Sequence, residues 1–131
     1  MLAHSDDSRV TRAFQELKYL MDAQSGGFFR LTEIEQPRLL TGKRYLEFLR
    51  VPALSAGLYV LPTGGADPQG PHKQDEIYYV IRGRARMRIG SEDQEVRAGI
   101  IIFVAAEVEH RFYEIKEELA VLVFFAPAES A

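Results

Sequence analysis

The stretch that decides the fold is His72-Lys73-Gln74-Asp75-Glu76-Ile77-Tyr78-Tyr79-Val80-Ile81-Arg82-Gly83. Its middle is rich in β-branched and aromatic residues, which favours a strand, and a histidine and a glutamate stand at its start. His110 opens a second run of this kind, Arg111-Phe112-Tyr113. Imidazole and carboxylate are ligands for divalent transition metals. The pattern predicts a metal site, and two unrelated loop histidines beside a surface carboxylate remain the alternative.

Length and composition indicate one globular domain. The chain has 131 residues, of which 47% are hydrophobic and 27% charged, which argues against disorder of the whole chain. With 16 basic and 19 acidic residues, the net charge of -3 creates no field that attracts nucleic acid. No apolar run approaches the roughly 20 residues that span a bilayer, and residues 1–7 lack a secretory signal. We expect a cytoplasmic protein without nucleic-acid or membrane partners.

The absence of cysteine restricts the possible chemistry. It excludes disulfides, thiolate zinc sites and cysteine nucleophiles, so His, Asp, Glu or Gln must hold any metal. Of the three histidines, His4 lies near the N-terminus, where a solvated side chain is expected. His72 and His110 remain as candidate ligands.

An amphipathic helix is predicted over residues 8–22. Apolar residues recur there at steps of three and four, and polar residues fill the other face. The apolar positions are Val10, Phe14, Leu17, Leu20 and Met21. Gly26-Gly27 ends the helix or begins a hinge. We expect residues 1–27 to form an N-terminal helical segment whose apolar stripe packs on one domain, residues 28–131.

From Phe28 onward, helical periodicity fades, and short apolar runs alternate with turn clusters such as Gln36-Pro37 and Thr41-Gly42. This pattern predicts an antiparallel barrel or jelly roll rather than βαβ units. The expected strands are residues 45–50, 54–61, 77–82, 85–89, 94–97, 100–104, 110–115 and 119–125. In Arg84-Ala85-Arg86-Met87-Arg88-Ile89 the arginines alternate with apolar residues, which favours a solvated face for the arginines over an anion-binding patch.

The stretch around His72 resembles the first motif of the cupin superfamily. That motif runs, roughly, Gly, five residues, His-x-His, three or four residues, Glu, six residues, Gly. Here three residues separate His72 from Glu76, and six separate Glu76 from Gly83. His72 takes the place of the second histidine of the motif. The first histidine would fall on Gly70, which cannot supply a ligand.

The stretch around His110 resembles the second cupin motif, which runs Gly, five residues, Pro-x-Gly, two residues, His, three residues, Asn. Gly99, the apolar run that follows it and His110 stand in the motif's register. The Pro, the second Gly and the Asn of the motif are replaced by Ala105, Glu107 and Glu114. These positions shape loops more than they bind metal. The resemblance covers about residues 45–127.

The resemblance implies an all-β cupin jelly-roll barrel in which His72, Glu76 and His110 bind a divalent transition metal. It also implies a homodimer, since dimers are typical of cupins. Fe²⁺, Mn²⁺, Zn²⁺ and Ni²⁺ all suit these ligands. The glycine in place of the first motif histidine leaves three outcomes: a three-ligand site with an extra water, a replacement ligand from Gln69 or Gln74, or a barrel that holds metal poorly.

Strand alternation predicts which side chains line the interior. The predicted pocket residues are Tyr78, Val80, Met87 and Phe112. A catalytic role for Tyr78 stays open beside plain packing, and Arg50 is a candidate for substrate contact or an exposed strand arginine. The outward residues Ile77, Tyr79 and Ile81 are apolar, so we expect the N-terminal segment or a second subunit to cover them.

The expected function is that of a small metal-dependent enzyme acting on a small polar substrate. The metal would act as a Lewis acid or, if iron, as an O₂ site. Dioxygenation, isomerisation, lyase chemistry and hydrolysis all occur on this fold, so the fold alone does not choose among them. The alternative is a non-catalytic cupin module that binds or senses a small ligand, with weak metal binding or none.

Overall fold

A computed structural model describes residues 25–130, so the helix predicted over residues 8–22 lies outside the described residues. The elements are α2 (Leu31–Thr41), β1 (Tyr45–Val51), β2 (Leu54–Leu61), β3 (Asp75–Ile89), β4 (Glu92–Arg97), β5 (Ile101–Val104) and β6 (His110–Ala126). Every strand pair is antiparallel. Within this range, no helix has the length and apolar character that crossing a bilayer requires.

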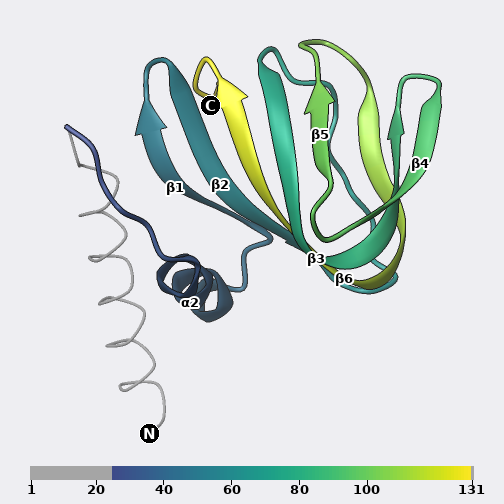
Figure 1. The fold of residues 1–131 in the computed structure, drawn as a ribbon, viewed down its shortest axis with the longest axis horizontal. Helices are drawn as coiled ribbons and strands as arrows, with labels where there is room; N and C mark the ends of the chain where they lie inside the picture. Colours follow the sequence, from purple (N-terminus) through teal and green to yellow (C-terminus); the bar gives the residue numbers. More distant parts are fainter. Residues whose placement is uncertain (1–24, 131) are drawn as a thin grey trace, which may run out of the picture.

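The strands form a jelly roll built around two long strands, β3 and β6 (Figure 1). The hydrogen-bonded order is β1-β2-β6-β3-β4, and β5 pairs with the first part of β3. The second part of β3 pairs with β4 and with the start of β6. Because β3 and β6 bend, their two halves belong to two facing layers. The antiparallel jelly roll predicted from the sequence is confirmed, although no pairing closes the sheet within the described residues.

The bend in β3 lies at Gly83, where the sequence suggested a gap between two strands. Gly83 has φ 97°, and a Cβ placed on it would lie 2.2 Å from the backbone oxygen of Glu118 on β6. Only glycine combines this backbone angle with so close an approach. The predicted strands 77–82 and 85–89 are therefore one strand, and 110–115 and 119–125 likewise form the single strand β6.

Helix α2 occupies residues that the sequence suggested were turns and short apolar runs. Gly42 ends it with φ 71° and donates its backbone N–H to the carbonyl of Arg38, so Thr41-Gly42 is a helix end. The helix contains Pro37 and has no apolar stripe at helical spacing, which is why the sequence pattern missed it. Its buried Ile34 packs in a cluster with β1 and β2, so tertiary packing supports it.

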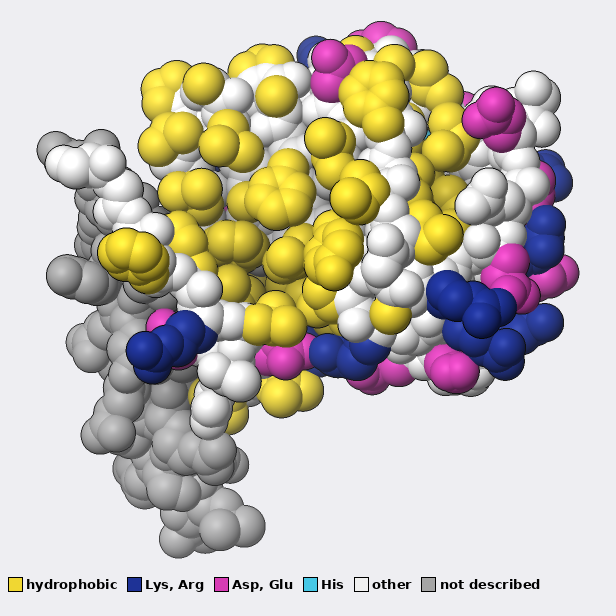
Figure 2. Space-filling model, viewed as in Figure 1, with side chains coloured by type: hydrophobic (Ala, Val, Ile, Leu, Met, Phe, Trp, Pro, Cys, Tyr) yellow, Lys and Arg dark blue, Asp and Glu magenta, His cyan; other side chains and the backbone are white. Residues whose placement is uncertain are grey.

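The hydrophobic residues form two clusters on opposite sides of the sheet. The inner cluster lies between the two layers and includes Tyr78, Val80, Met87, Phe112 and Phe125. The outer cluster joins α2 to the outer side of β1 and β2 and includes Ile34, Leu46, Phe48, Leu58 and Val60. Figure 2 shows that apolar side chains continue across the outer face, beyond the area that α2 covers. The exposed large apolar residues of β3 and β5, which face one another in the pairing of these strands, are Ile77, Tyr79, Ile101 and Phe103.

The arginines of β3 are matched by carboxylates. Arg84 pairs with Glu117 at 3.1 Å, and Arg86 and Arg88 both pair with Asp93 on β4, at 2.8 and 3.3 Å. Between them, Ala85 and Met87 are buried, as the alternation predicted. Because each arginine pairs with a carboxylate, with Asp93 shared by two of them, this face has the character of a solvated, ion-paired surface rather than an anion-binding patch.

Candidate metal centre

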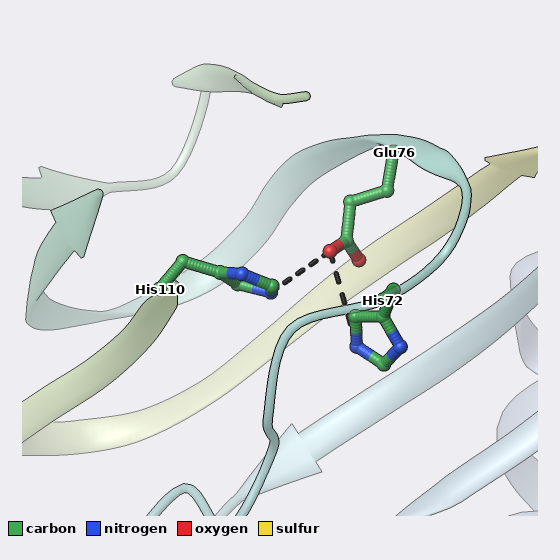
Figure 3. A group of neighbouring side chains, drawn as sticks. All are labelled: His72, Glu76 and His110. Atoms are coloured by element: carbon green, nitrogen blue, oxygen red, sulfur yellow. Dashed lines mark ion pairs between the residues drawn. The ribbon is translucent and has the colours of Figure 1, made fainter. Parts of the chain in front are cut away.

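His72, Glu76 and His110 converge between the two layers of the jelly roll (Figure 3). His72 lies in the loop before β3, Glu76 near the start of β3, and His110 at the start of β6. One ligand atom from each residue lies within 4.8 Å of the other two. The sequence placed these residues at the ends of strands, and the bent strands bring those ends together.

The carboxylate of Glu76 stands between the two imidazoles. Its Oε1 lies 2.8 Å from Nε2 of His110 and 3.9 Å from Nε2 of His72. Glu76 and His110 are buried, whereas His72 is only partly so. The site is therefore closed on the β6 side and approached from the side of His72.

A hydrogen bond orients the imidazole of His110. Its Nδ1 lies 2.9 Å from the carbonyl oxygen of Val108. A carbonyl oxygen can only accept, so Nδ1 donates, and Nε2 is directed at Glu76. Burial acts to lower the pKa of His110, but the contacts with Glu76 and the Val108 carbonyl outweigh it and raise the pKa. Without a metal, a proton on Nε2 is therefore favoured.

Glu76 lacks the partners that a buried carboxylate needs. It is 2% exposed, and beyond its ion-pair contact with His110 neither oxygen has a hydrogen-bond partner among residues 25–130. An isolated carboxylate in a protein interior costs several kcal/mol unless a donor or a cation compensates it. A divalent cation held by Glu76 and both Nε2 atoms would supply that compensation. The residues present therefore fit a metal.

The two glutamines suggested as replacement ligands lie in different surroundings. The Oε1 of Gln69 lies 3.0 Å from Nε2 of His72, so the Gln69 amide reaches the site beside Gly70. Its Nε2 donates to Asp67 and to the hydroxyl of Tyr78, both at 3.2 Å. The amide of Gln74 instead donates to Oγ of Ser130 at 2.6 Å. Gln69 is thus the glutamine placed at the centre.

Asp67, which was not among the residues predicted from the sequence, anchors the loop that carries His72. Its carboxylate accepts from the hydroxyl of Tyr59 at 2.7 Å and from the backbone N–H of Phe112 at 2.9 Å. These bonds tie the loop to β2 and β6, and Asp67 also accepts from the amide of Gln69. In the sequence, an aspartate in a loop rich in Gly and Pro is indistinguishable from an ordinary turn residue.

Tyr78 belongs to the site, while the other predicted pocket residues pack or lie elsewhere. Its hydroxyl lies 3.1 Å from Nε2 of His110, and burial raises its pKa well above the usual value. Val80 and Phe112 are buried in the inner core. Met87 lines a separate cavity of about 550 Å³ between β4 and β5. The cavity beside His72 has a volume of about 250 Å³ and is lined by Tyr45, Tyr59, Pro68, Gln69, His72, Val123 and Glu129.

A second carboxylate, which was not among the residues predicted from the sequence, approaches His72 on the side opposite Glu76. Glu129 follows β6 in the chain, and its Oε2 lies 3.5 Å from Nδ1 of His72. Arg50, a suggested substrate contact, donates to the backbone oxygen of Glu129 at 2.9 Å and to the carboxylate of Glu47. In the described contacts, Arg50 therefore holds the segment after β6.

Comparisons with known proteins agree with the fold. A family model for the cupin domain matches residues 57–126. An uncharacterized protein of Streptomyces coelicolor is 47% identical over 102 residues, which cover 78% of this chain and 97% of that protein. A crystal structure from Bacillus halodurans has a TM-score of 0.65 at 20% identity and covers 85% of this chain and 89% of its own.

A second crystal structure, from Thermus thermophilus, has a TM-score of 0.56 at 26% identity and covers 64% of this chain and 82% of its own. The segment matched by the family model contains His72, Glu76 and His110, the three residues that converge. The protein therefore belongs to the cupin domain family.

Proposed function

We propose that this protein is a small metal-dependent cupin enzyme whose His72, Glu76 and His110 hold a divalent transition metal. The observation that carries the proposal is the Glu76 carboxylate, which is buried, has no hydrogen-bond partner in the described residues and faces two imidazole nitrogens. Two nitrogen ligands and a carboxylate suit Fe²⁺, Mn²⁺, Ni²⁺ and Zn²⁺. A divalent cation would compensate this carboxylate more fully than its contact with the His110 imidazole alone.

We further propose Gln69 as the fourth ligand, in the role that the first motif histidine would otherwise fill. The distance between Gln69 Oε1 and His72 Nε2 is 3.0 Å. Because an amide oxygen is a weaker ligand than imidazole for these metals, we expect it to exchange more readily.

A metal at this position supplies Lewis-acid chemistry or, if it is iron, redox chemistry. The chain's own residues supply position and surroundings. Burial raises the pKa of Tyr78, which favours its neutral hydroxyl, and this hydroxyl hydrogen-bonds Gln69 and His110 within the site. The 250 Å³ cavity beside His72 has room for a small polar substrate. Oxygenase, isomerase and lyase reactions are all compatible with this arrangement.

Elemental analysis of the purified protein tests whether a metal is bound. We expect about one equivalent of Fe, Mn, Zn or Ni in the wild type and its loss in the His72→Ala and His110→Ala variants, because each removes a ligand. Gln94→Ala is the matched control, since Gln94 is an exposed glutamine of β4 that lines the separate cavity, and it should keep the metal. A wild type without metal after growth in all four ions would overturn the proposal and favour a non-catalytic binding module.

An oxygen-consumption assay then divides the reaction classes. The metal-loaded protein is mixed with diols, catechols and small keto acids, and oxygen uptake is measured. Uptake that disappears in His110→Ala would identify an oxygenase. Conversion of substrate without oxygen uptake would identify isomerase or lyase chemistry.

A further inference from the structure

We propose that the segment after β6, residues 127–130, is part of the metal centre and that Glu129 is a positioning residue that orients His72. This inference rests on the proposed metal site and deepens it, because it names what controls one of the ligands. Glu129 would act through the imidazole of His72 rather than on a substrate.

The segment is held in place by hydrogen bonds, although it has no regular secondary structure. Its backbone or side chains bond Pro52, Ser55, Arg50 and Gln74, at distances of 3.2, 2.9, 2.9 and 2.6 Å. The bond that places Glu129 most directly is the one from its N–H to Oγ of Ser55, because Ser55 is fully buried in β2. The position of the Glu129 backbone is therefore set by the body of the fold.

The imidazole of His72 has a carboxylate on each side. Nε2 faces Glu76 at 3.9 Å, and Nδ1 faces Oε2 of Glu129 at 3.5 Å. A carboxylate at Nδ1 keeps the proton on that nitrogen and leaves the Nε2 lone pair for the metal. The 3.5 Å separation is longer than an ordinary hydrogen bond and is within ion-pair distance.

His110 provides an internal comparison. Its Nδ1 bonds the carbonyl of Val108, two residues away, so the strand that carries His110 also orients it. His72 lies in a loop and meets its oxygen from a distant part of the chain. The match to the cupin family model ends at residue 126, so Glu129 lies beyond it. The geometry assigns to Glu129 the role that a local carbonyl has for His110.

If Glu129 orients a ligand, metal binding and docking of residues 127–130 are linked, and the linkage is reciprocal. A bound metal then stabilises the docked segment, and release of the segment lowers the affinity of the site for the metal. The site would then respond to any partner or modification that displaces residues 127–130.

The test uses Co²⁺ as the probe, with visible absorption spectra and competition against a chelator, on the full chain. Loss of a group that orients a metal ligand typically lowers metal affinity by about 10- to 100-fold. We expect Glu129→Ala to lower the affinity for Co²⁺ by about 10- to 100-fold and to shift the absorption bands of the bound Co²⁺. Glu129→Gln keeps an oxygen that can accept from Nδ1, so we expect it to restore part of the affinity. Glu95→Ala is the control, because this exposed carboxylate pairs with Arg97 on β4, and it should match the wild type.

The outcomes separate this inference from the metal site itself. A wild type that does not bind Co²⁺ would overturn both. A wild type that binds it, with His72→Ala defective but Glu129→Ala unchanged in affinity and spectrum, would overturn only the role of Glu129. Hydrogen exchange gives a second measurement: Co²⁺ should slow exchange at residues 128–130 in the wild type and not in His72→Ala. Exchange rates that do not change with Co²⁺ in either protein would overturn the linkage between metal binding and docking of residues 127–130.

Discussion

The two faces of the first half of β3 reverse the usual distribution of polar and apolar residues. On the inward face lies Glu76, a carboxylate that is 2% exposed. On the outward face lie Ile77 and Tyr79, which are 42% and 39% exposed. Charged residues are seldom fully buried without a partner, and extended apolar surface is seldom left open to water.

Each face points to a partner that the described residues do not supply. The inner face has ligand atoms directed at one point, where we propose that a cation binds. The outer face is apolar where α2 does not reach it, and it continues from Ile77 and Tyr79 onto Ile101 and Phe103 of β5. Strand alternation decides which side chains share a face. Alternation does not supply what covers a face, which is a cation for the inner face and a second protein surface for the outer face in our proposals.

The largest effect is expected when the inner face receives its cation. A ligand that binds only the folded state at 100 times its dissociation constant raises the free energy of unfolding by about 2.7 kcal/mol. We expect Zn²⁺ or Mn²⁺ at that excess to raise the unfolding midpoint of the wild type in calorimetry. Glu76→Gln should abolish this shift, because an amide carries no charge to compensate the cation. An equal shift in both proteins would remove Glu76 from the site.

The outer face is tested by self-association. We propose a second copy of the chain as its cover, because an exposed apolar sheet face can pair with itself across a two-fold axis. Phe103 is 59% exposed, and Phe103→Asp should convert a dimer into a monomer in light scattering. Leu39→Asp is the control, since Leu39 is 68% exposed on α2. A monomeric wild type would overturn the dimer and make residues 1–24 the remaining candidate cover.

A smaller effect is expected when the missing motif ligand is restored. Gly70 has open space around the position of a Cβ and is not among the glycines with positive φ. Gly70→His should therefore fit and add an imidazole ligand, strengthening Zn²⁺ binding by about tenfold, since imidazole is the better ligand for these metals. Chelator competition measures the gain. No gain would indicate that Gln69 already fills this coordination position.

The smallest effect on stability is expected in the second half of β3, where the outward side chains are arginines. Hydrogen bonds from Tyr113, Arg86 and Arg88 hold the pKa of Asp93 below its usual value, although burial acts to raise it. A lowered folded-state pKa contributes stability above the unfolded-state pKa, and this contribution is lost as pH falls through the folded-state pKa. Asp93→Asn should therefore lower the unfolding midpoint at pH 7, and the difference from the wild type should shrink below pH 4.

Local patterns in the sequence predicted most of the framework and the three converging residues. The alternation in β3 correctly assigned Tyr78 and Val80 inward and Ile77 and Tyr79 outward, because a strand places successive side chains on opposite faces. The prediction failed where support comes from distant residues. Helix α2 has no apolar stripe of its own and depends on packing against β1 and β2.

The sequence by itself determined the strands, their two faces and the residues with ligand chemistry, because each depends on residue type and on spacing along a single segment. Tertiary structure alone decided that Gly83 bends a strand rather than ending it, that Gln69 rather than Gln74 reaches the centre, and that Glu129 approaches His72. The physical reason is the same in each case. These contacts join segments far apart in the chain, so no local pattern records them.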